Sequence, residues 1–251
     1  MFLFSVFADL AAPHNKTSAV VRPDVPWGIY KRQQARISRH RLYPMTAFYT
    51  LYCTTVLVLA LLSAHPWVAL VFYLAGIPLW TFIEYLFHRF VLHGHFADGE
   101  GFIRKFAHRR LDPLHWEHHE RPWDGMHING EIKDLLPLFF VFAPLSFIAP
   151  IYTLPALYAG VVESYVAEEW IHHSVHFYNF RNPYFRYIKR HHLYHHSPKG
   201  ETRGYGLTNG FWDIVCQTRY PKEVIAALYH RSKRSSTPKA RVSTHATEKP
   251  A

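Results

Sequence analysis

The chain has 251 residues, of which 49% are hydrophobic, 17% aromatic and only 18% charged. This composition excludes an intrinsically disordered chain, which would contain few aromatic residues and more charge. Two cysteines are too few for a disulfide scaffold or a thiolate zinc site. The formal net charge is +10, and the 20 histidines outnumber the 18 acidic residues, which ordinary packing does not require.

Basic residues lie mainly outside the long apolar stretches: seven Lys and Arg precede residue 42, and another group follows residue 230. Lys and Arg beside membrane spans on the cytoplasmic side explain this distribution more simply than nucleic-acid binding. No nucleic-acid-binding motif accompanies the charge. We therefore expect a membrane protein without a nucleic-acid partner.

The first apolar stretch, residues 42–83, contains no Asp, Glu, Lys or Arg. A transmembrane helix needs about 20 apolar residues, so these 42 residues are enough for two. Because Pro tends to end a helix, His65-Pro66 marks a turn in the middle. The pattern predicts a hairpin of two helices over about 45–64 and 67–88.

A second uncharged stretch covers residues 135–162 and contains four prolines. Its 28 residues are short for two full spans. It forms either one span with a re-entrant segment or two helices that continue into polar sequence. We favour two helices, because the residues after Pro155 can continue as one helix through residue 171 and beyond.

About four spans place both basic termini on one side of the membrane, and the positive-inside rule makes that side cytoplasmic. The predicted fold class is therefore all-α: a multi-pass integral membrane bundle of about four transmembrane helices. A cytosolic helical cap holds the histidines that follow the second and fourth spans. The predicted organisation is a basic cytosolic segment at 1–41, a membrane domain at 42–218 and a basic, disordered tail at 219–251.

The histidines outside the flanks form four clusters. These are His88 with His93; His115, His118 and His119; His172, His173 and His176; and His191, His192, His195 and His196. Helix positions i, i+3 and i+4 share a face, so both H-x-x-H-H motifs project three rings together, and His172 projects with His176. Residues five apart lie about 140° round a helix. The pair at 88 and 93 converges only if the helix ends there or its rings reach different metals.

Clustered imidazoles repel one another when charged and leave buried donors and acceptors unpaired when neutral. A metal removes both problems, because neutral imidazole binds iron, zinc and copper well. One ion takes about four to six ligands, so about ten converging histidines predict two ions.

In this order, the clusters resemble those of the fatty acid hydroxylase and sterol desaturase superfamily of membrane di-metal oxygenases, most closely the fatty acid 2-hydroxylase branch. The first histidine box of that branch resembles EYLFHRFVLH, and its last box and downstream segment resemble YIKRHHLYHH and GYGLTNGFWDIVCQT. The resemblance covers about residues 75–218. It implies metal ligation by His88, His93, His115, His118, His119, His172, His176, His192, His195 and His196.

The resemblance also implies an O2-dependent di-iron oxidoreductase that hydroxylates a C–H bond of a fatty acyl chain, with zinc as an alternative metal in recombinant material. The sequence lacks the heme domain fused to many fatty acid 2-hydroxylases, so we expect a separate electron donor. This donor would be a small b-type cytochrome, or a ferredoxin with its reductase. Glu84 and Glu169 lie one helical turn before His88 and His172, so each carboxylate either accepts the outer N–H of that ring or forms a surface ion pair.

Several alternatives stay open at this point. A carotenoid or sterol oxygenase, or a desaturase, would use the same scaffold, and a transporter or sensor would bind metal without catalysis. A heme-binding electron carrier would instead place single histidines opposite each other in facing spans. A carboxylate di-iron bundle would need a second E-x-x-H pair besides Glu169 and His172. The roles of His173 and His191 are also open.

Overall fold

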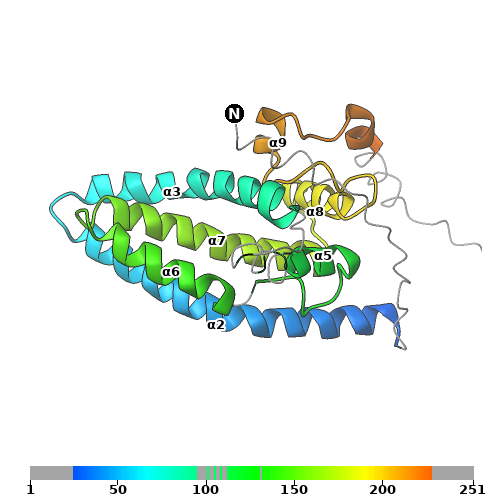
Figure 1. The fold of residues 1–251 in the computed structure, drawn as a ribbon, viewed down its shortest axis with the longest axis horizontal. Coiled ribbons are helices and arrows are strands. Elements are labelled where there is room, and N and C mark those ends of the chain that lie inside the picture. The colour runs from blue at the N-terminus through cyan, green and yellow to red at the C-terminus, as the bar shows by residue number, and fades with distance from the viewer. Residues whose placement is uncertain are drawn as a thin grey trace, which may run out of the picture. The chain divides into compact units, whose positions relative to one another are not determined.

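The computed structural model describes residues 25–94, 112–130 and 132–227, together with positions 101, 105 and 108 (Figure 1). Every element within these residues is helical, which confirms the all-α class for this part of the chain. Residue contacts divide the chain into Met1–Arg219 and Tyr220–Ala251, and all helices named below belong to the first unit. The predicted domain boundaries stay predictions, and most of the expected disordered tail lies outside the described residues.

Two long helices form the predicted hairpin. The first, α2 (Trp27–Leu61), and the second, α3 (Pro66–Leu86), are separated by four residues that include His65. Pro66 is the first residue of α3. Pro has no backbone N–H, and at this position the N–H of any residue would lack a partner within the helix. The structure extends α2 well before the expected start at 45. Lys, Arg and Gln are good helix formers, and one face of the helix is buried from Ala35 to Ala60.

Helix α3 continues directly into η1 (Phe87–Leu92), a short π-helix. Two helices are long and apolar enough to cross a membrane, Trp27–Leu61 and Pro66–Leu92. Large apolar side chains are exposed near the turn between them, where Leu62 is 79% and Trp67 78% exposed. Such exposure is expected of a surface that meets lipid.

The second uncharged stretch forms two helices, as favoured from the sequence. Helix α6 (Ile132–Ser146) has 15 residues, about 22 Å at about 1.5 Å per residue, which is less than the hydrocarbon thickness of about 30 Å. Helix α7 (Leu154–Phe177) is longer but carries glutamates in its second half. Among the described residues, two helices therefore qualify as membrane spans, and four spans stay a prediction.

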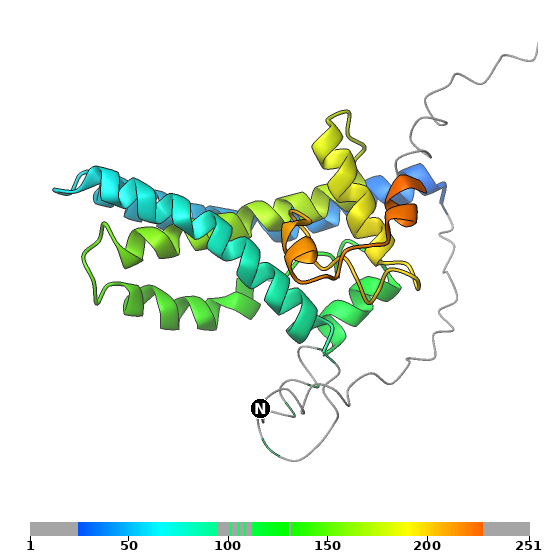
Figure 2. The same cartoon turned by 90° about the horizontal axis from the view of Figure 1, so that it is seen from above.

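Helix α7 is central, since it packs against α2, α3 and α6 (Figures 1 and 2). It crosses α3 at very close range: a Cβ atom at Gly160 would lie 2.0 Å from the Tyr73 carbonyl oxygen, and one at Gly76 would lie 2.5 Å from that of Leu157. Small residues allow such close helix contacts. The two glycines thus determine how α3 and α7 are placed. Helix α7 carries histidines near its C-terminal end, and η1, which continues α3, carries His88.

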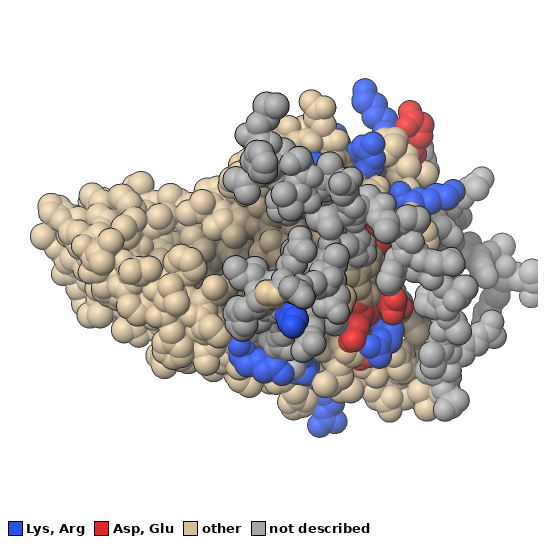
Figure 3. Space-filling view, in the orientation of Figure 1, with Lys and Arg blue, Asp and Glu red and all other residues tan. Residues whose placement is uncertain are grey.

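Three shorter helices lie near those ends: α5 (Asp112–Glu120), α8 (Pro183–His195) and α9 (Phe211–Val215). Asn182 begins α8 by accepting hydrogen bonds from the N–H groups of Tyr184 and Phe185, the usual role of an N-cap. Charged side chains gather over this part, whereas none is visible over the α2–α3 turn (Figure 3).

Candidate metal centre

The structure gathers all ten predicted ligands into two groups of five. The first group consists of His88, His93, His115, His119 and His195, and the second of His118, His172, His176, His192 and His196. Within each group, one ligand atom from every residue lies within 4.8 Å of all the others. Eight of the ten are buried. That these residues bind metal stays a prediction, but the convergence that it requires is present.

The two H-x-x-H-H motifs each serve both groups. On α5, His115 and His119 enter the first group, and His118 enters the second. On α8 the pattern is reversed, since His195 enters the first group while two residues four apart enter the second. The His119 and His196 ring centroids are 4.3 Å apart across the boundary. Sequence spacing predicted that each motif shares a face, but not that its i+3 member would reach a different group.

The π-helix explains how His88 and His93 join the same group. The N–H of His93 donates to the carbonyl oxygen of His88 at 3.1 Å, the i+5 hydrogen bond of a π turn. This wider turn brings residues five apart onto similar faces. Both Nε2 atoms consequently contact Nε2 of His115, at 3.1 Å from His88 and 2.9 Å from His93.

The first group has the donor set that a cation needs. His88 Nδ1 lies 2.5 Å from the Tyr205 carbonyl oxygen, and His195 Nδ1 lies 2.8 Å from that of Arg203. A carbonyl oxygen can only accept, so both Nδ1 atoms carry a proton. A neutral imidazole has a single N–H, and each Nε2 therefore directs a lone pair into the group, where His93 Nε2 lies 2.9 Å from His195 Nε2.

The second group is even more crowded. His172 Nε2 lies 2.9, 3.1 and 3.2 Å from the Nε2 atoms of His118, His192 and His176. His192 Nε2 also lies 2.8 and 2.9 Å from those of His176 and His196. Each ring nitrogen has one in-plane position, filled by a proton or a lone pair, so it cannot make three hydrogen bonds at once. A cation among these nitrogens would resolve the conflict, and both groups therefore fit a metal ion.

Electrostatics favour the form of histidine that binds metal. Burial and neighbouring imidazoles hold the pKa values of His115, His118 and His192 well below the ordinary 6.5. These rings are therefore neutral near pH 7, and a metal need not displace a proton from them.

The two carboxylates singled out in the sequence have different partners from those expected. Glu84 accepts from the N–H groups of Leu207 and Thr208, at 2.5 and 3.1 Å, and from the Thr208 hydroxyl at 2.6 Å. The outer N–H of His88 donates instead to the Tyr205 carbonyl. The backbone that follows α8 thus lies against α3. Its Tyr205 carbonyl accepts the His88 N–H that helical spacing had assigned to Glu84.

Glu169 belongs to a network around His173. The Asn129 side-chain amide donates to the Glu169 carboxylate at 2.8 Å. The Ser38 hydroxyl donates to Asn129 Oδ1 at 2.5 Å and accepts from His173 Nδ1 at 2.8 Å. His173 lies outside both groups. Its ring bonds Ser38 and has a structural role.

His191 also lies outside both groups, with Nε2 3.2 Å from Oδ2 of Asp213. Burial alone would raise the pKa of Asp213, but hydrogen bonds from His191, Thr218 and Gly206 lower it below its ordinary value. Our reading of the sequence did not identify Asp213 as a site residue. The sequence feature that could have identified it is the Trp-Asp pair after the last histidine box.

The comparisons with known proteins agree with this geometry. A family model described as fatty acid hydroxylase matches residues 73–218, which include all ten histidines. The chain belongs to the fatty acid hydroxylase family. This confirms the resemblance found in the sequence.

The chain resembles several fatty acid hydroxylases. The dihydroceramide fatty acyl 2-hydroxylase FAH2 of Arabidopsis thaliana is 31% identical over 147 residues, which cover 57% of this chain and 58% of that protein. The fatty acid 2-hydroxylase of Rattus norvegicus is 28% identical over 161 residues, covering 60% and 40%. The chain therefore matches less than two thirds of the length of these relatives.

A solved structure described as full-length scs7p, with only the hydroxylase domain visible, matches with a TM-score of 0.63 and 26% sequence identity. The match covers 80% of this chain and 81% of that chain. The fold of this family member therefore extends over most of the present chain.

Proposed function

We propose that the protein hydroxylates a C–H bond of a fatty acyl chain in a membrane lipid, with O2 and electrons from a separate donor. The observation that carries the proposal is the convergence of ten histidines into two groups of five within a fatty acid hydroxylase domain. The names of the relatives, which include fatty acid 2-hydroxylase, favour the carbon next to the acyl carbonyl.

Each histidine group would hold one iron ion through neutral imidazole nitrogens. Bound iron would supply the dioxygen chemistry that protein side chains cannot provide. The chain's own contribution is to fix ten rings in place, to keep them neutral through burial, and to exclude water from the rings of the buried members. Zinc fits the same nitrogens but is redox-inert, so a zinc-loaded protein would be folded and inactive.

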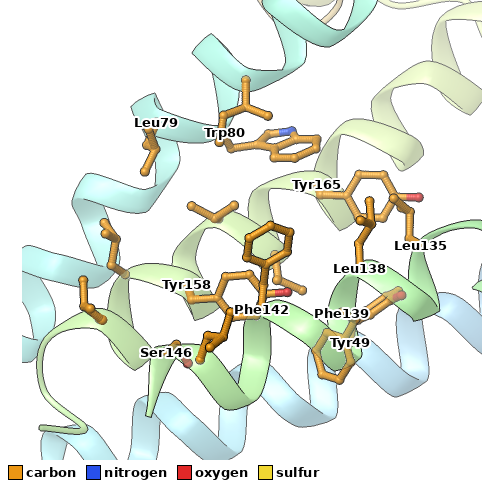
Figure 4. Close-up of a pocket in the computed structure, with 16 residues that line it drawn as sticks. Tyr49, Leu79, Trp80, Leu135, Leu138, Phe139, Phe142, Ser146, Tyr158 and Tyr165 are labelled. Atoms are coloured by element: carbon orange, nitrogen blue, oxygen red, sulfur yellow. The ribbon is translucent and has the colours of Figure 1, made fainter. Parts of the chain in front are cut away.

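An apolar pocket supports an acyl substrate. It has a volume of about 510 Å³ and lies between α3, α6 and α7 (Figure 4). Tyr165 and Leu135 lie toward one end and Ser146 toward the other. The Trp80 and Tyr165 rings, 5.3 Å apart, belong to the same lining. Apolar walls with few polar atoms suit a hydrocarbon chain.

The pocket is positioned for oxidation near the carbonyl end of that chain. Ile83 and Tyr165 line it, and they precede His88 and His172 by five and seven residues, about 7.5 and 10.5 Å of helix. The other end of the lining, at Leu154, is 18 residues from His172, about 27 Å of helix. A chain with its carbonyl end at the histidines would therefore extend its methyl end toward Leu154.

The same proposal includes the arrangement in the membrane. Helices α2 and α3 would cross the bilayer, and α6 and α7 would enter it as a second pair, giving the four-helix arrangement expected from the sequence. The histidine groups and both basic termini would face the cytoplasm. There the electron donor, a small b-type cytochrome or a ferredoxin with its reductase, would dock.

The test is lipid mass spectrometry on a strain that lacks 2-hydroxy lipids and expresses the chain, together with iron analysis of protein purified without oxygen. We expect 2-hydroxy acyl lipids and two irons per chain. His118→Ala should abolish the product and reduce the iron content. The matched control is His127→Ala, because His127 lies outside both groups and contacts Glu117 and Asp124 at 2.7 and 3.0 Å.

Three results would contradict the proposal. A changed carotenoid or sterol profile would indicate another substrate, and an unsaturated acyl product would indicate desaturation. Iron-loaded protein that consumes no O2 when supplied with electrons and lipid would indicate a metal-binding protein without catalysis.

A further inference from the structure

Residues 203–208, which we name the carbonyl strap, connect the region after α8 to α9. They contact the first histidine group through two backbone oxygens and through the ring of Tyr205, whose centroid lies 5.2 to 5.8 Å from those of His88, His93 and His195. The Arg203 carbonyl accepts from His195 Nδ1 and the Tyr205 carbonyl accepts from His88 Nδ1. The second group differs. In the described part of the chain, the buried Nδ1 atoms of His118, His176 and His196 have no hydrogen-bond partner.

Two buried carboxylates hold the strap from its other side. Asp213 accepts from the N–H groups of Tyr205 and Gly206, both at 2.9 Å. Glu84 accepts from those of Leu207 and Thr208. Four consecutive backbone N–H groups therefore point at carboxylate oxygens. Asp213 is itself fixed, because the Thr218 hydroxyl donates to its Oδ1 at 2.7 Å.

One peptide unit connects Asp213 to His88. The Tyr205 carbonyl and the Gly206 N–H belong to the same peptide group, which accepts from His88 Nδ1 on one side and donates to Asp213 Oδ2 on the other. Hydrogen bonds in such a chain polarise one another. A carboxylate bonded directly to a metal-binding histidine fixes its tautomer and raises its basicity, and here a peptide group relays the same effect.

His195 is connected to the same region through backbone groups alone. The Arg203 carbonyl shares its peptide group with the Gly204 N–H, which donates to the Thr218 carbonyl at 3.0 Å. The Thr218 N–H in turn donates to the Asp213 carbonyl at 2.9 Å. His88 is therefore connected to the Asp213 carboxylate through one peptide group, whereas His195 is connected to the backbone of Thr218 and Asp213.

The shape of the strap leaves little room for adjustment. Gly204 has a φ of 71°, a conformation that favours glycine. A Cβ atom at Gly206 would lie 2.0 Å from the Asn209 carbonyl oxygen and 3.0 Å from Asp213 Oδ2. The carbonyls of the strap are therefore held at fixed positions against the first group.

From this geometry we propose that Asp213 is a positioning residue that acts through the carbonyl strap on the first histidine group alone, and that the first group consequently binds its metal more tightly than the second. The proposal rests on the metal-binding part of the proposed function. It does not depend on which lipid is oxidised, or on whether any lipid is.

The experiment uses the full chain in detergent, loaded with zinc and then exposed to increasing concentrations of a chelator, with zinc per chain as the readout. For the unmodified protein we expect two steps, with one ion lost well before the other. Asp213→Asn replaces one acceptor oxygen by an NH2 group, which cannot accept from a backbone N–H. We expect it to weaken the tighter site by about 10- to 100-fold, the usual cost of losing such a partner, and to leave the weaker site unchanged.

Glu169→Gln is the matched control, because it neutralises a half-buried carboxylate that bonds Asn129 and not the strap. It should preserve the two steps. If Asp213→Asn does not fold by circular dichroism, Gly206→Ala provides the second variant, since it displaces the strap without changing the charge of any carboxylate. It should weaken the tighter site in the same selective way.

The outcomes separate this proposal from the proposed function. A single release step in the unmodified protein, equal weakening of both sites, or no change at the tighter site in the strap variants would overturn the role of Asp213. Two-step release without any hydroxylated lipid would leave that role intact and count against hydroxylation. Failure to bind two ions at all would overturn both.

Discussion

The length of the apolar pocket makes a quantitative prediction about acyl chain length, tested by Leu157→Trp. Leu157 lines the pocket three residues from Leu154 at its far end. From His172 to Leu154, α7 covers about 27 Å, whereas from His172 to Leu157 it covers about 22.5 Å. An indole at position 157 would therefore shorten the space available to the chain by about 4.5 Å.

This shortening converts into a loss of binding energy. A C–C bond of about 1.5 Å at a tetrahedral angle advances an extended chain by about 1.25 Å. The full length then accommodates about 21 carbons and the shortened length about 18. Three methylenes lose their apolar contacts, at about 0.8 kcal/mol each, which gives about 2.4 kcal/mol or roughly a 60-fold loss in affinity. Substrates of 18 carbons or fewer should be affected little.

The assay is a competition between acyl chains of different lengths, with the hydroxylated products quantified by mass spectrometry. Val141→Trp is the matched control, because Val141 lies on α6, is 54% exposed and does not line the pocket. Leu157→Trp should shift the product distribution toward shorter chains while the control keeps the original one. If both variants hydroxylate long and short chains in the original ratio, the pocket does not hold the acyl chain.

Three further predictions concern stability. Gly160→Ala should destabilise the protein by about 1–3 kcal/mol, the usual cost of overpacking, because its Cβ atom would lie 2.0 Å from the Tyr73 carbonyl oxygen. Gly28→Ala should instead stabilise α2 by up to about 1 kcal/mol, since the nearest atom to a Cβ at Gly28 is the flexible end of Arg32 at 3.7 Å. Thermal unfolding in detergent measures the stability of both variants. Equal melting temperatures for the two would refute the close crossing of α3 and α7. In metal-free protein, burial and neighbouring imidazoles keep the pKa values of His118, His192 and His196 well below 6.5, so the unfolded chain binds more protons once the pH falls below that value. The free energy of unfolding should therefore decrease as the pH is lowered from 7 to 5, and a melting temperature independent of pH over this range would show that these rings are not neutral in the folded state.

The features predicted correctly from the sequence are those that depend on local composition. An uncharged run with His65-Pro66 at its centre was enough to predict the α2–α3 hairpin, because the length of the apolar run and the position of the turn are local properties. The extension of α2 to Trp27 was not predicted. It depends on burial of Ala35 and Ser38, and burial of Ser38 involves partners at positions 129 and 173.

The site shows the same limit. Helical spacing identified which histidines share a face, but it could not identify their partners on other helices. The π turn between His88 and His93 depends on one i+5 hydrogen bond, and no residue pattern in the sequence indicated it. Likewise, Glu84 lies one turn before His88, but backbone more than 100 residues later in the chain determines its partners.

The arrangement of the H-x-x-H-H motifs explains why two ions would share one centre. Each motif contributes its i and i+4 rings to one group and its i+3 ring to the other, and the assignment is opposite on α5 and α8. Any rotation of either helix would therefore disturb both groups at once. The motifs thus combine the two groups in one centre, whereas the hydrogen bonds from the carbonyl strap reach the first group alone. This difference is why we expect the ion in the first group to be held more tightly.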